Sequence, residues 1–502
     1  MTAKGFDHDL YIQLQSRYIL ERVKGWDKLY LEFGGKLTLD LHAKRCLPGY
    51  KPNAKLQLLQ TLKDQAEIII CVHAGDIERN KIRGDFGTTY GQEVLRLIDD
   101  LRGRGLVVNS VLFTRYQGQP GTKTFAQKLE NRGVRTYKHR SIPGYPLDVD
   151  AIVSDQGYGS NCWIETTRPI VVVTGPGPGS GKLATCLSQL YHESQRGVRA
   201  GYAKFETFPV WNIPLKHPLN VAYEAATADL KDLNIIDSFH LEAHGESAVS
   251  YNRDLEMFPV VRRIIETITG QESCYKSPTD MGVNQIAFAI TDDQVVREAS
   301  RQEIIRRYFK TAGDVKRGEA DADTLHRMKI LMQSQQLRPE DRPCVEPARQ
   351  YRDQVLARPG QAKEVSTVAI QLEDGAIITG RNSALMTAPA AALLNAIKHL
   401  GGLPDAMHLL PPIIIEPIQN LKGKTFDLKD QVLCCEEILM ALAISAVTNP
   451  VAQTAMEQLP RLDGAQAHAT TFVLGTDEAL YSRLRMNLTW DSQFLTDSLF
   501  AQ

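Results

Sequence analysis

Apolar, β-branched runs alternate with amphipathic segments over the first two-thirds of the chain. Between several runs lie segments with apolar residues at helical spacing, such as residues 91–105 and 122–133, each ending at a glycine that suits a helix C-terminus. Strands that are apolar along their length and alternate with helices indicate a parallel sheet covered on both faces. We therefore predict an α/β fold with a Rossmann-like, doubly wound parallel sheet. The predicted strands are residues 28–33, 66–74, 106–116, 134–139, 151–155 and 169–174.

The pattern changes in the last third of the chain. Residues 311–365 are charged and poor in strand signals, which indicates solvated helices. Asp374 and Gly375 between two apolar arms then predict a hairpin, and two later alanine-rich helices are apolar around most of their circumference. Such helices must be buried, in their own core or against another subunit. We expect an N-terminal Rossmann-like unit (1–157), a second α/β unit (158–310), a helical connector (311–365) and a mostly helical, α+β C-terminal domain (366–502) that supports a homo-oligomer.

Composition narrows the class of protein. The 58 lysines and arginines nearly balance the 59 aspartates and glutamates, so no net field attracts nucleic acid or an anionic membrane. The N-terminus lacks a signal-peptide layout, and the longest strongly apolar run, residues 438–447, is half a membrane span. The eight cysteines form no CxxC pair and suit reduced thiols. We expect a cytoplasmic protein whose partners are a small-molecule ligand and its own copies.

The stretch PIVVVTGPGPGSGKLATCLSQLYHE (169–193) predicts a strand, a phosphate-binding loop and a helix. A Walker-type loop needs glycines that let backbone N–H groups approach phosphate, a lysine for the terminal phosphates, and a helix N-terminus facing the anion. The candidate cofactor-binding residues are Gly175, Gly177, Gly179, Ser180, Gly181, Lys182 and Thr185.

This loop departs from the standard motif at two positions. The first glycine of the standard spacing falls on Pro176, and Leu183 stands where a serine or threonine would hold magnesium. Thr185 lies two residues further, roughly 200° around the helix, and does not simply substitute. We expect a phosphate-bearing ligand, most simply ATP or another nucleotide, with Mg²⁺ as a candidate companion. The alternative is a tight glycine turn with Lys182 on the surface.

Further chemistry is expected after the next strands. Lys204 and Glu206 end the strand that follows the loop helix, where they could hold an acidic substrate and a metal beside the transferred phosphate. Asp237 follows the apolar pair Ile235 and Ile236 and could reach a cation. With Lys182, these three residues form the predicted catalytic set. The alternative is a strand end with solvated charges.

Several long stretches of the chain are distinctive: residues 28–37, 175–193, 201–220, 222–230, 251–254 and 275–284. They resemble a bacterial protein family described as a domain of unknown function. The resemblance spans nearly the whole chain and implies a Rossmann-like N-terminal part with a P-loop-like segment, but no catalytic residues. Some members of that family carry the label ATP-dependent peptidase.

The motifs of this chain do not support the peptidase label. HLEAH (240–244) places two histidines four residues apart, but its glutamate is at the middle position and no third ligand is evident. The serine-hydrolase motif GxSxG is absent, because Pro178 precedes Ser180 by two residues. We therefore predict a nucleotide- or phosphate-binding enzyme acting on a small acidic molecule, by phosphoryl transfer or nucleotide-dependent hydrolysis or ligation. The alternative is a non-enzymatic ligand-binding or assembly protein with a degenerate loop.

Overall fold

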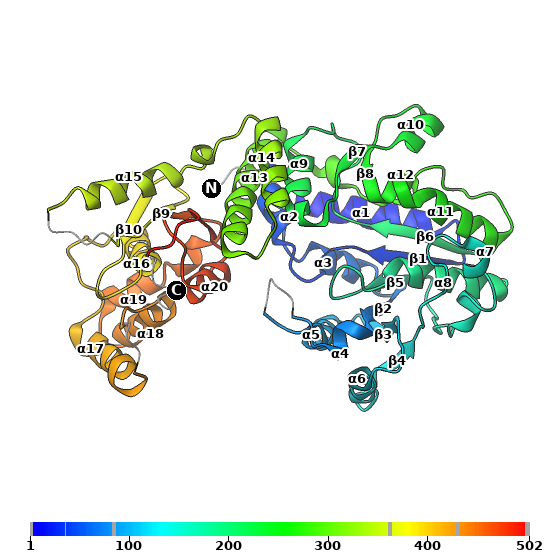
Figure 1. Ribbon diagram of the computed structural model, residues 1–502, viewed down its shortest axis with the longest axis horizontal. Helices are drawn as coiled ribbons and strands as arrows, with labels where there is room; N and C mark the ends of the chain where they lie inside the picture. Colours follow the sequence, from blue (N-terminus) through cyan, green and yellow to red (C-terminus); the bar gives the residue numbers. More distant parts are fainter. Residues whose placement is uncertain (1–3, 36, 83–86, 360–363, 428–430, 497–502) are drawn as a thin grey trace. The chain divides into compact units, whose positions relative to one another are not determined.

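The chain divides into two compact units between Ser300 and Arg301. The computed structural model describes residues 4–35, 37–82, 87–359, 364–427 and 431–496. The first unit contains a six-stranded parallel sheet, drawn in blue to green in Figure 1, with strand order β4-β3-β2-β5-β1-β6. Its strands are β1 (Lys28–Phe33), β2 (Ala66–His73), β3 (Val107–Thr114), β4 (Arg135–Lys138), β5 (Ile170–Thr174) and β6 (Ala200–Phe205).

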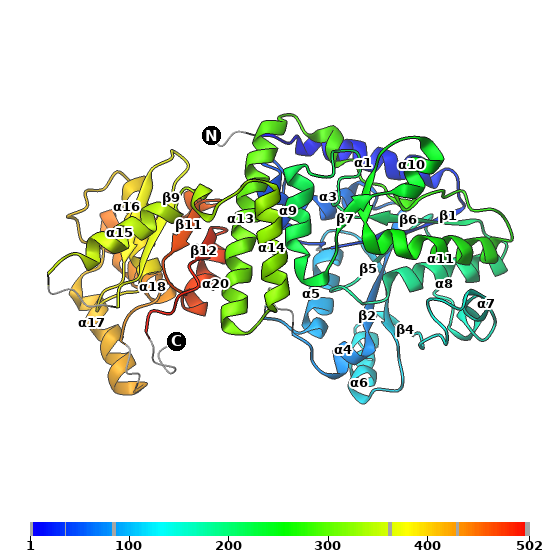
Figure 2. The same ribbon diagram turned by 45° about the horizontal axis from the view of Figure 1, so that its top comes forward.

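Helices cover both faces of this sheet, which confirms the predicted doubly wound α/β fold (Figure 2). The central strand β5 is buried at every position, as expected for a strand with helices on both sides. One face packs against α1 (His8–Val23), α3 (Ala54–Thr61), α5 (Tyr90–Arg102) and α6 (Pro120–Glu130). The other packs against α7 (Val149–Ile152), α8 (Lys182–Gln195) and α11 (Asn252–Thr269).

The remaining elements of this unit lie in the connections between strands and after β6. Short helices α2 (Leu41–Cys46) and α4 (Ala74–Glu78) follow β1 and β2. After β6, the chain forms α9 (Pro218–Ala226), a two-stranded ribbon of β7 (Asn234–Ile236) and β8 (Val249–Tyr251), and the helices α10 (Ser238–His244) and α12 (Pro278–Met281).

Two expectations for this unit differ from the structure. Residues 151–155, predicted as a strand, instead include the end of α7, whose first turn is capped by the Asp148 side chain accepting from the Ala151 amide at 3.1 Å. The expected boundary near residue 157 does not divide the sheet, because β5 pairs with β2 on one side and β1 on the other. The expected units 1–157 and 158–310 therefore share one sheet.

The second unit is an α+β structure. It contains most of α13 (Asp293–Arg317), then α14 (Ala322–Ser334), α15 (Val345–Leu356) and a four-stranded sheet of order β10-β9-β11-β12. Its strands are β9 (Thr367–Gln371), β10 (Ile377–Arg381), β11 (Gln466–Ala469) and β12 (Asn487–Trp490), and its further helices are α16 (Ala388–Leu400), α17 (Pro412–Asn420), α18 (Cys435–Ala446), α19 (Pro450–Met456) and α20 (Gly475–Arg483).

Details of the second unit follow from its sequence. Asp374 and Gly375 form the turn of the predicted β9–β10 hairpin, with Gly375 at φ 84°. The described part of the expected connector 311–365 consists mostly of helices, and α15 packs on the sheet: the Thr367 hydroxyl donates to the Ala348 carbonyl of α15 at 2.8 Å. On α18, Met440, Ile444 and Val447 are exposed. The expected homo-oligomer stays a prediction.

Over the part of the chain that the structure describes, no helix is both long and apolar enough to cross a bilayer.

A partly buried ion pair is expected to make the second unit sensitive to acid, since the Asp491 and Arg349 side chains are 10% and 31% exposed. Arg349 donates to both carboxylate oxygens of Asp491, at 2.6 and 3.0 Å. Burial raises the pKa of Asp491, but contacts with His468 and Arg349 outweigh it and lower the pKa to about 2. A carboxyl whose pKa is lower in the folded protein than in the unfolded chain stabilises the fold. Its full contribution to the free energy of unfolding is present above the unfolded-state pKa of about 3.9 and is lost as the pH falls towards 2.

We expect Asp491→Asn to lower the free energy of unfolding by about 2 kcal/mol at pH 7, with a shrinking difference as the pH falls from 5 to 2. Urea unfolding followed by circular dichroism measures this difference. Asp353→Asn is the matched control, because the Asp353 side chain is 70% exposed. If Asp491→Asn lowered the free energy of unfolding by the same amount at every pH, the ion pair would not be the source of the loss.

Candidate functional site

The loop between β5 and α8 is held in a compact shape that only glycine permits at several positions. A Cβ at Gly175 would lie 2.5 Å from the Cys71 carbonyl oxygen of β2, and Gly179 and Gly181 have φ of 71° and 87°. The Thr114 hydroxyl at the end of β3 donates to the Ser180 carbonyl at 2.9 Å. The loop is therefore fixed against two neighbouring strands.

The N-terminus of α8 faces the space above this loop. The cap residue Gly181 offers no side chain to the first-turn amides, and Lys182 is the first helical residue. An uncapped helix N-terminus combines free N–H donors with the positive end of the helix dipole, which favours an anion. The Thr185 hydroxyl is already engaged, because it donates to the Gly181 carbonyl at 2.8 Å.

A cavity of about 1060 Å³ opens over the loop at the carboxyl edge of the sheet. This is the expected ligand-binding edge of a doubly wound sheet. Its lining has two electrostatically different parts. Lys182 begins α8 beside the loop, and Arg115 directly follows Thr114, which contacts the loop. The ends of β1 and β6 and the start of α11 contribute the acidic side chains Glu32, Glu206 and Asp254, with Lys204 and Arg253. The other charged lining residues are Lys81, Glu93, Arg140 and Asp232.

Lys204 is at the centre of the acidic part. Its Nζ donates to both oxygens of Asp254, at 2.9 and 2.6 Å, and lies 3.3 Å from Glu206 Oε1. The side chains of Lys204 and Asp254 are 21% and 25% exposed. Gly34 is required beside this cluster, because a Cβ there would lie 2.7 Å from Glu206 Cγ. One cation thus faces two carboxylates.

The electrostatics of the cluster favour a protonated Lys204 and a basic Glu206. Burial lowers the pKa of the Lys204 ammonium, but the charges of Asp254 and Glu206 outweigh it and raise the pKa. Burial raises the pKa of Glu206, although Lys204 opposes this shift. A carboxylate with a raised pKa is better able to accept a proton from a substrate.

Two buried hydroxyl groups complete the lining. Ser188 Oγ on α8 and Tyr251 Oη at the start of α11 have no hydrogen-bond partner among the described residues, and both residues are at most 2% exposed. Buried polar groups are normally paired, so each of these hydroxyls indicates a partner supplied by a ligand or by water.

The structure brings most of the predicted site residues together, and two of them are not part of the lining. Ser180 is buried, and its side chain is not part of the lining among the described residues. Asp237 caps α10 by accepting from the His240 amide, and it accepts from the Thr279 hydroxyl at 2.6 Å. Asp237 therefore has a structural role away from the cavity. The predicted residues in the lining are Gly175, Gly177, Gly179, Gly181, Lys182, Thr185, Lys204 and Glu206.

Other lining residues were not predicted as site residues. Glu32 ends β1 and accepts from the Tyr202 hydroxyl at 2.8 Å, and Arg115 follows β3 directly. Their place at strand ends is a signal that sequence reasoning could have used. Arg140 lies in a loop and Asp254 in the first turn of α11, and no local pattern relates them to the phosphate loop.

Comparison with known proteins identifies the family. The model of the "Domain of unknown function DUF1846, N-terminal" matches residues 4–336, and that of its C-terminal counterpart matches residues 340–500. The "UPF0371 protein" of Clostridium botulinum (strain Loch Maree / Type A3) is 61% identical over 496 residues, which is 99% of each chain. The "UPF0371 protein" of Clostridium tetani (strain Massachusetts / E88) is 61% identical with the same coverage. The chain therefore belongs to the DUF1846 family, a family of unknown function, as the resemblance predicted.

Proposed function

We propose that the protein binds a nucleotide or another phosphate-bearing small molecule, with the phosphates on the loop 175–182. The observation that carries this proposal is the uncapped N-terminus of α8, which follows a glycine-shaped loop and opens into a cavity of about 1060 Å³. The basic side chains Arg115, Arg140 and Lys182 also line this cavity and would neutralise phosphate charge.

The acidic part of the cavity would hold the second reactant. Lys204 is already matched by Asp254 and Glu206, so its charge is not available for an acidic substrate. We therefore replace the acidic molecule expected from the sequence with one that presents a hydroxyl or an amine. In phosphoryl transfer, the oxygen or nitrogen of that hydroxyl or amine would bond to the phosphorus of the terminal phosphate, while the bond from this phosphorus to the leaving phosphate breaks. Glu206 would accept the proton that the hydroxyl or amine loses. Glu32 offers a carboxylate to a Mg²⁺ ion that accompanies the nucleotide.

A second function, ligand binding without turnover, is favoured by one feature of the loop. Leu183 replaces the hydroxyl that holds magnesium in the standard motif, and the Thr185 hydroxyl is bonded to Gly181. A protein of this kind would sense or store its ligand. Phosphate release from bound ATP, with a hydroxyl- or amine-bearing acceptor present, separates the enzyme from the sensor.

Thermal unfolding with ATP, GTP, NAD or inorganic phosphate, each with and without Mg²⁺, tests the proposal. A ligand at about 100 times its dissociation constant should stabilise the protein by about 2.7 kcal/mol. Lys182→Ala should weaken binding roughly 10- to 100-fold, because a charge-assisted hydrogen bond contributes about 1.5–3 kcal/mol. The control is Lys128→Ala, an exposed lysine on α6. The proposal would be contradicted if a ligand stabilised Lys182→Ala and Lys128→Ala equally. It would also be contradicted if no ligand stabilised the wild type.

A further inference from the structure

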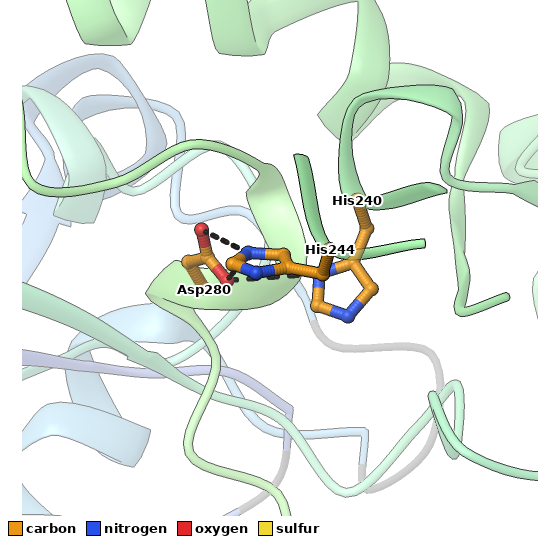
Figure 3. Close-up of side chains that lie close together, drawn as sticks. All are labelled: His240, His244 and Asp280. Carbon is orange, nitrogen blue, oxygen red and sulfur yellow. Dashed lines mark hydrogen bonds and ion pairs between the residues drawn. The ribbon is translucent and has the colours of Figure 1, made fainter. Parts of the chain in front are cut away.

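Two histidines and an aspartate meet at a place that does not belong to the cavity lining. His240 and His244 lie one turn apart on α10, and Asp280 reaches them from α12 (Figure 3). Asp280 Oδ1 is 3.0 Å from His244 Nε2 and 3.6 Å from His240 Nδ1. The three donor atoms all lie within 4.8 Å of one another. Asp280 is thus the third ligand that the HLEAH stretch alone does not reveal.

These spacings fit a tetrahedral metal. Bonds of about 2.0–2.1 Å from zinc to nitrogen or oxygen, at tetrahedral angles, separate neighbouring donors by about 3.3 Å. The distances from Asp280 Oδ1 to His244 Nε2 and His240 Nδ1, 3.0 and 3.6 Å, lie on either side of this value, and the two imidazole nitrogens lie within 4.8 Å of each other. Binding would therefore require side-chain shifts that bring all three donors to this spacing.

Hydrogen bonds already orient the carboxylate. Asp280 Oδ2 accepts from the backbone amides of Lys276 at 2.8 Å and Ser277 at 3.1 Å. These bonds hold the carboxylate in place, with Oδ1 at 3.0 Å and Oδ2 at 3.2 Å from His244 Nε2. Partners of this kind orient ligating carboxylates in metal sites.

The two helices that carry the donors are also tied to each other. Asp237, fully buried, caps α10 through the His240 amide and accepts from the Thr279 hydroxyl and amide of α12, at 2.6 and 3.2 Å. The donor set is therefore preorganised. His240 is 7% exposed, whereas the His244 side chain is 39% exposed and gives solvent access to the site.

We propose that His240, His244 and Asp280 bind a divalent transition metal, with Zn²⁺ as the best fit. Two imidazoles and one carboxylate suit zinc, whereas Mg²⁺ and Ca²⁺ prefer oxygen ligands. Three protein ligands leave a fourth position for water or an exogenous ligand. On binding, His240 Nδ1 exchanges its hydrogen bond with Ser277 Oγ, now 3.0 Å, for the metal.

The site differs from that of a zinc peptidase. Glu242, the glutamate of HLEAH, is exposed and is not a member of the donor cluster. The metal would instead hold α10 against α12, and Pro278 and Met281 of α12 line the large cavity. The zinc site does not depend on the proposed phosphate binding, and each can fail without the other.

Titration of chelator-treated full-length protein with Zn²⁺ and with Co²⁺ tests the proposal. We expect one equivalent of zinc to bind, and bound cobalt to give a tetrahedral visible spectrum without a thiolate charge-transfer band. His244→Ala and Asp280→Asn should weaken binding by more than the roughly 10- to 100-fold cost of losing an outer partner. Neither substitution empties the core, since His244 is exposed and asparagine keeps the shape of Asp280.

The control is His326→Ala, an exposed histidine on α14. Circular dichroism confirms that each variant is folded before titration. Absence of zinc binding at micromolar metal, or binding that both ligand variants retain at wild-type affinity, would overturn the proposal. A cobalt spectrum with a thiolate band would assign the metal to cysteine and overturn it as well.

Discussion

Replacing Lys204 with methionine should lower the free energy of unfolding by about 3 kcal/mol, the lower end of the range for breaking a buried ion pair. The change leaves Asp254 and Glu206 facing each other without their shared cation. The lower end applies because the Lys204 and Asp254 side chains remain 21% and 25% exposed. Urea unfolding at pH 8 measures the loss.

The pH dependence of this loss separates charge from packing. Burial raises the pKa of Glu206, so this carboxyl gains a proton readily once its cation is removed. The deficit of Lys204→Met should therefore be smaller at pH 5 than at pH 8. Lys128→Met on the exposed face of α6 is the matched control and should change little. A deficit below about 1 kcal/mol at both pH values would show that the cluster is effectively solvated.

Gly175→Ala should abolish ligand binding by the loop. The added methyl group would lie 2.5 Å from both the Cys71 carbonyl oxygen and Ser180 Oγ. Cys71 is in β2 and pairs with Leu112 of β3, and its neighbour Ile70 also pairs with Thr174 of β5, so the sheet resists a shift of the Cys71 carbonyl. The loop must shift instead, and we expect phosphate affinity to fall by at least about 100-fold, since a displacement of 1 Å at a site can cost this much.

A second glycine provides the control for this substitution. Gly25 is exposed, and a Cβ there would meet only the Arg22 carbonyl at 3.8 Å. Gly25→Ala should leave both stability and binding unchanged. The measurement is calorimetric titration with the ligand that stabilises the wild type most. Undiminished binding to folded Gly175→Ala would show that the phosphates do not occupy the loop.

Local pattern was sufficient to predict the strand, loop and helix at residues 169–193. Three consecutive valines, alternate glycines and helical spacing each specify their element within a few residues. Local pattern was not sufficient at residues 151–155, where the predicted strand is wrong. A run of so few apolar residues fits a capped helical turn equally well.

Long-range pairing could not be predicted from the sequence. The order of the sheet places β5 between β2 and β1, so the expected boundary at residue 157 falls within one sheet. Lys204 and Asp254 are 50 residues apart and belong to a strand and a helix whose packing no local pattern specifies. His244 and Asp280 are likewise 36 residues apart. The candidate sites depend on these non-local contacts.

Hydrogen–deuterium exchange of the loop and the first turn of α8 tests the central claim most directly. We would compare the protein alone with the protein in ATP and Mg²⁺, and in inorganic phosphate, at millimolar concentrations. Bound phosphate should slow exchange in a peptide spanning residues 175–188, because the amides of Lys182, Leu183 and Ala184 become donors to it, while peptides of the second unit stay unchanged. Unaltered exchange in that peptide with every ligand would contradict a phosphate site on this loop.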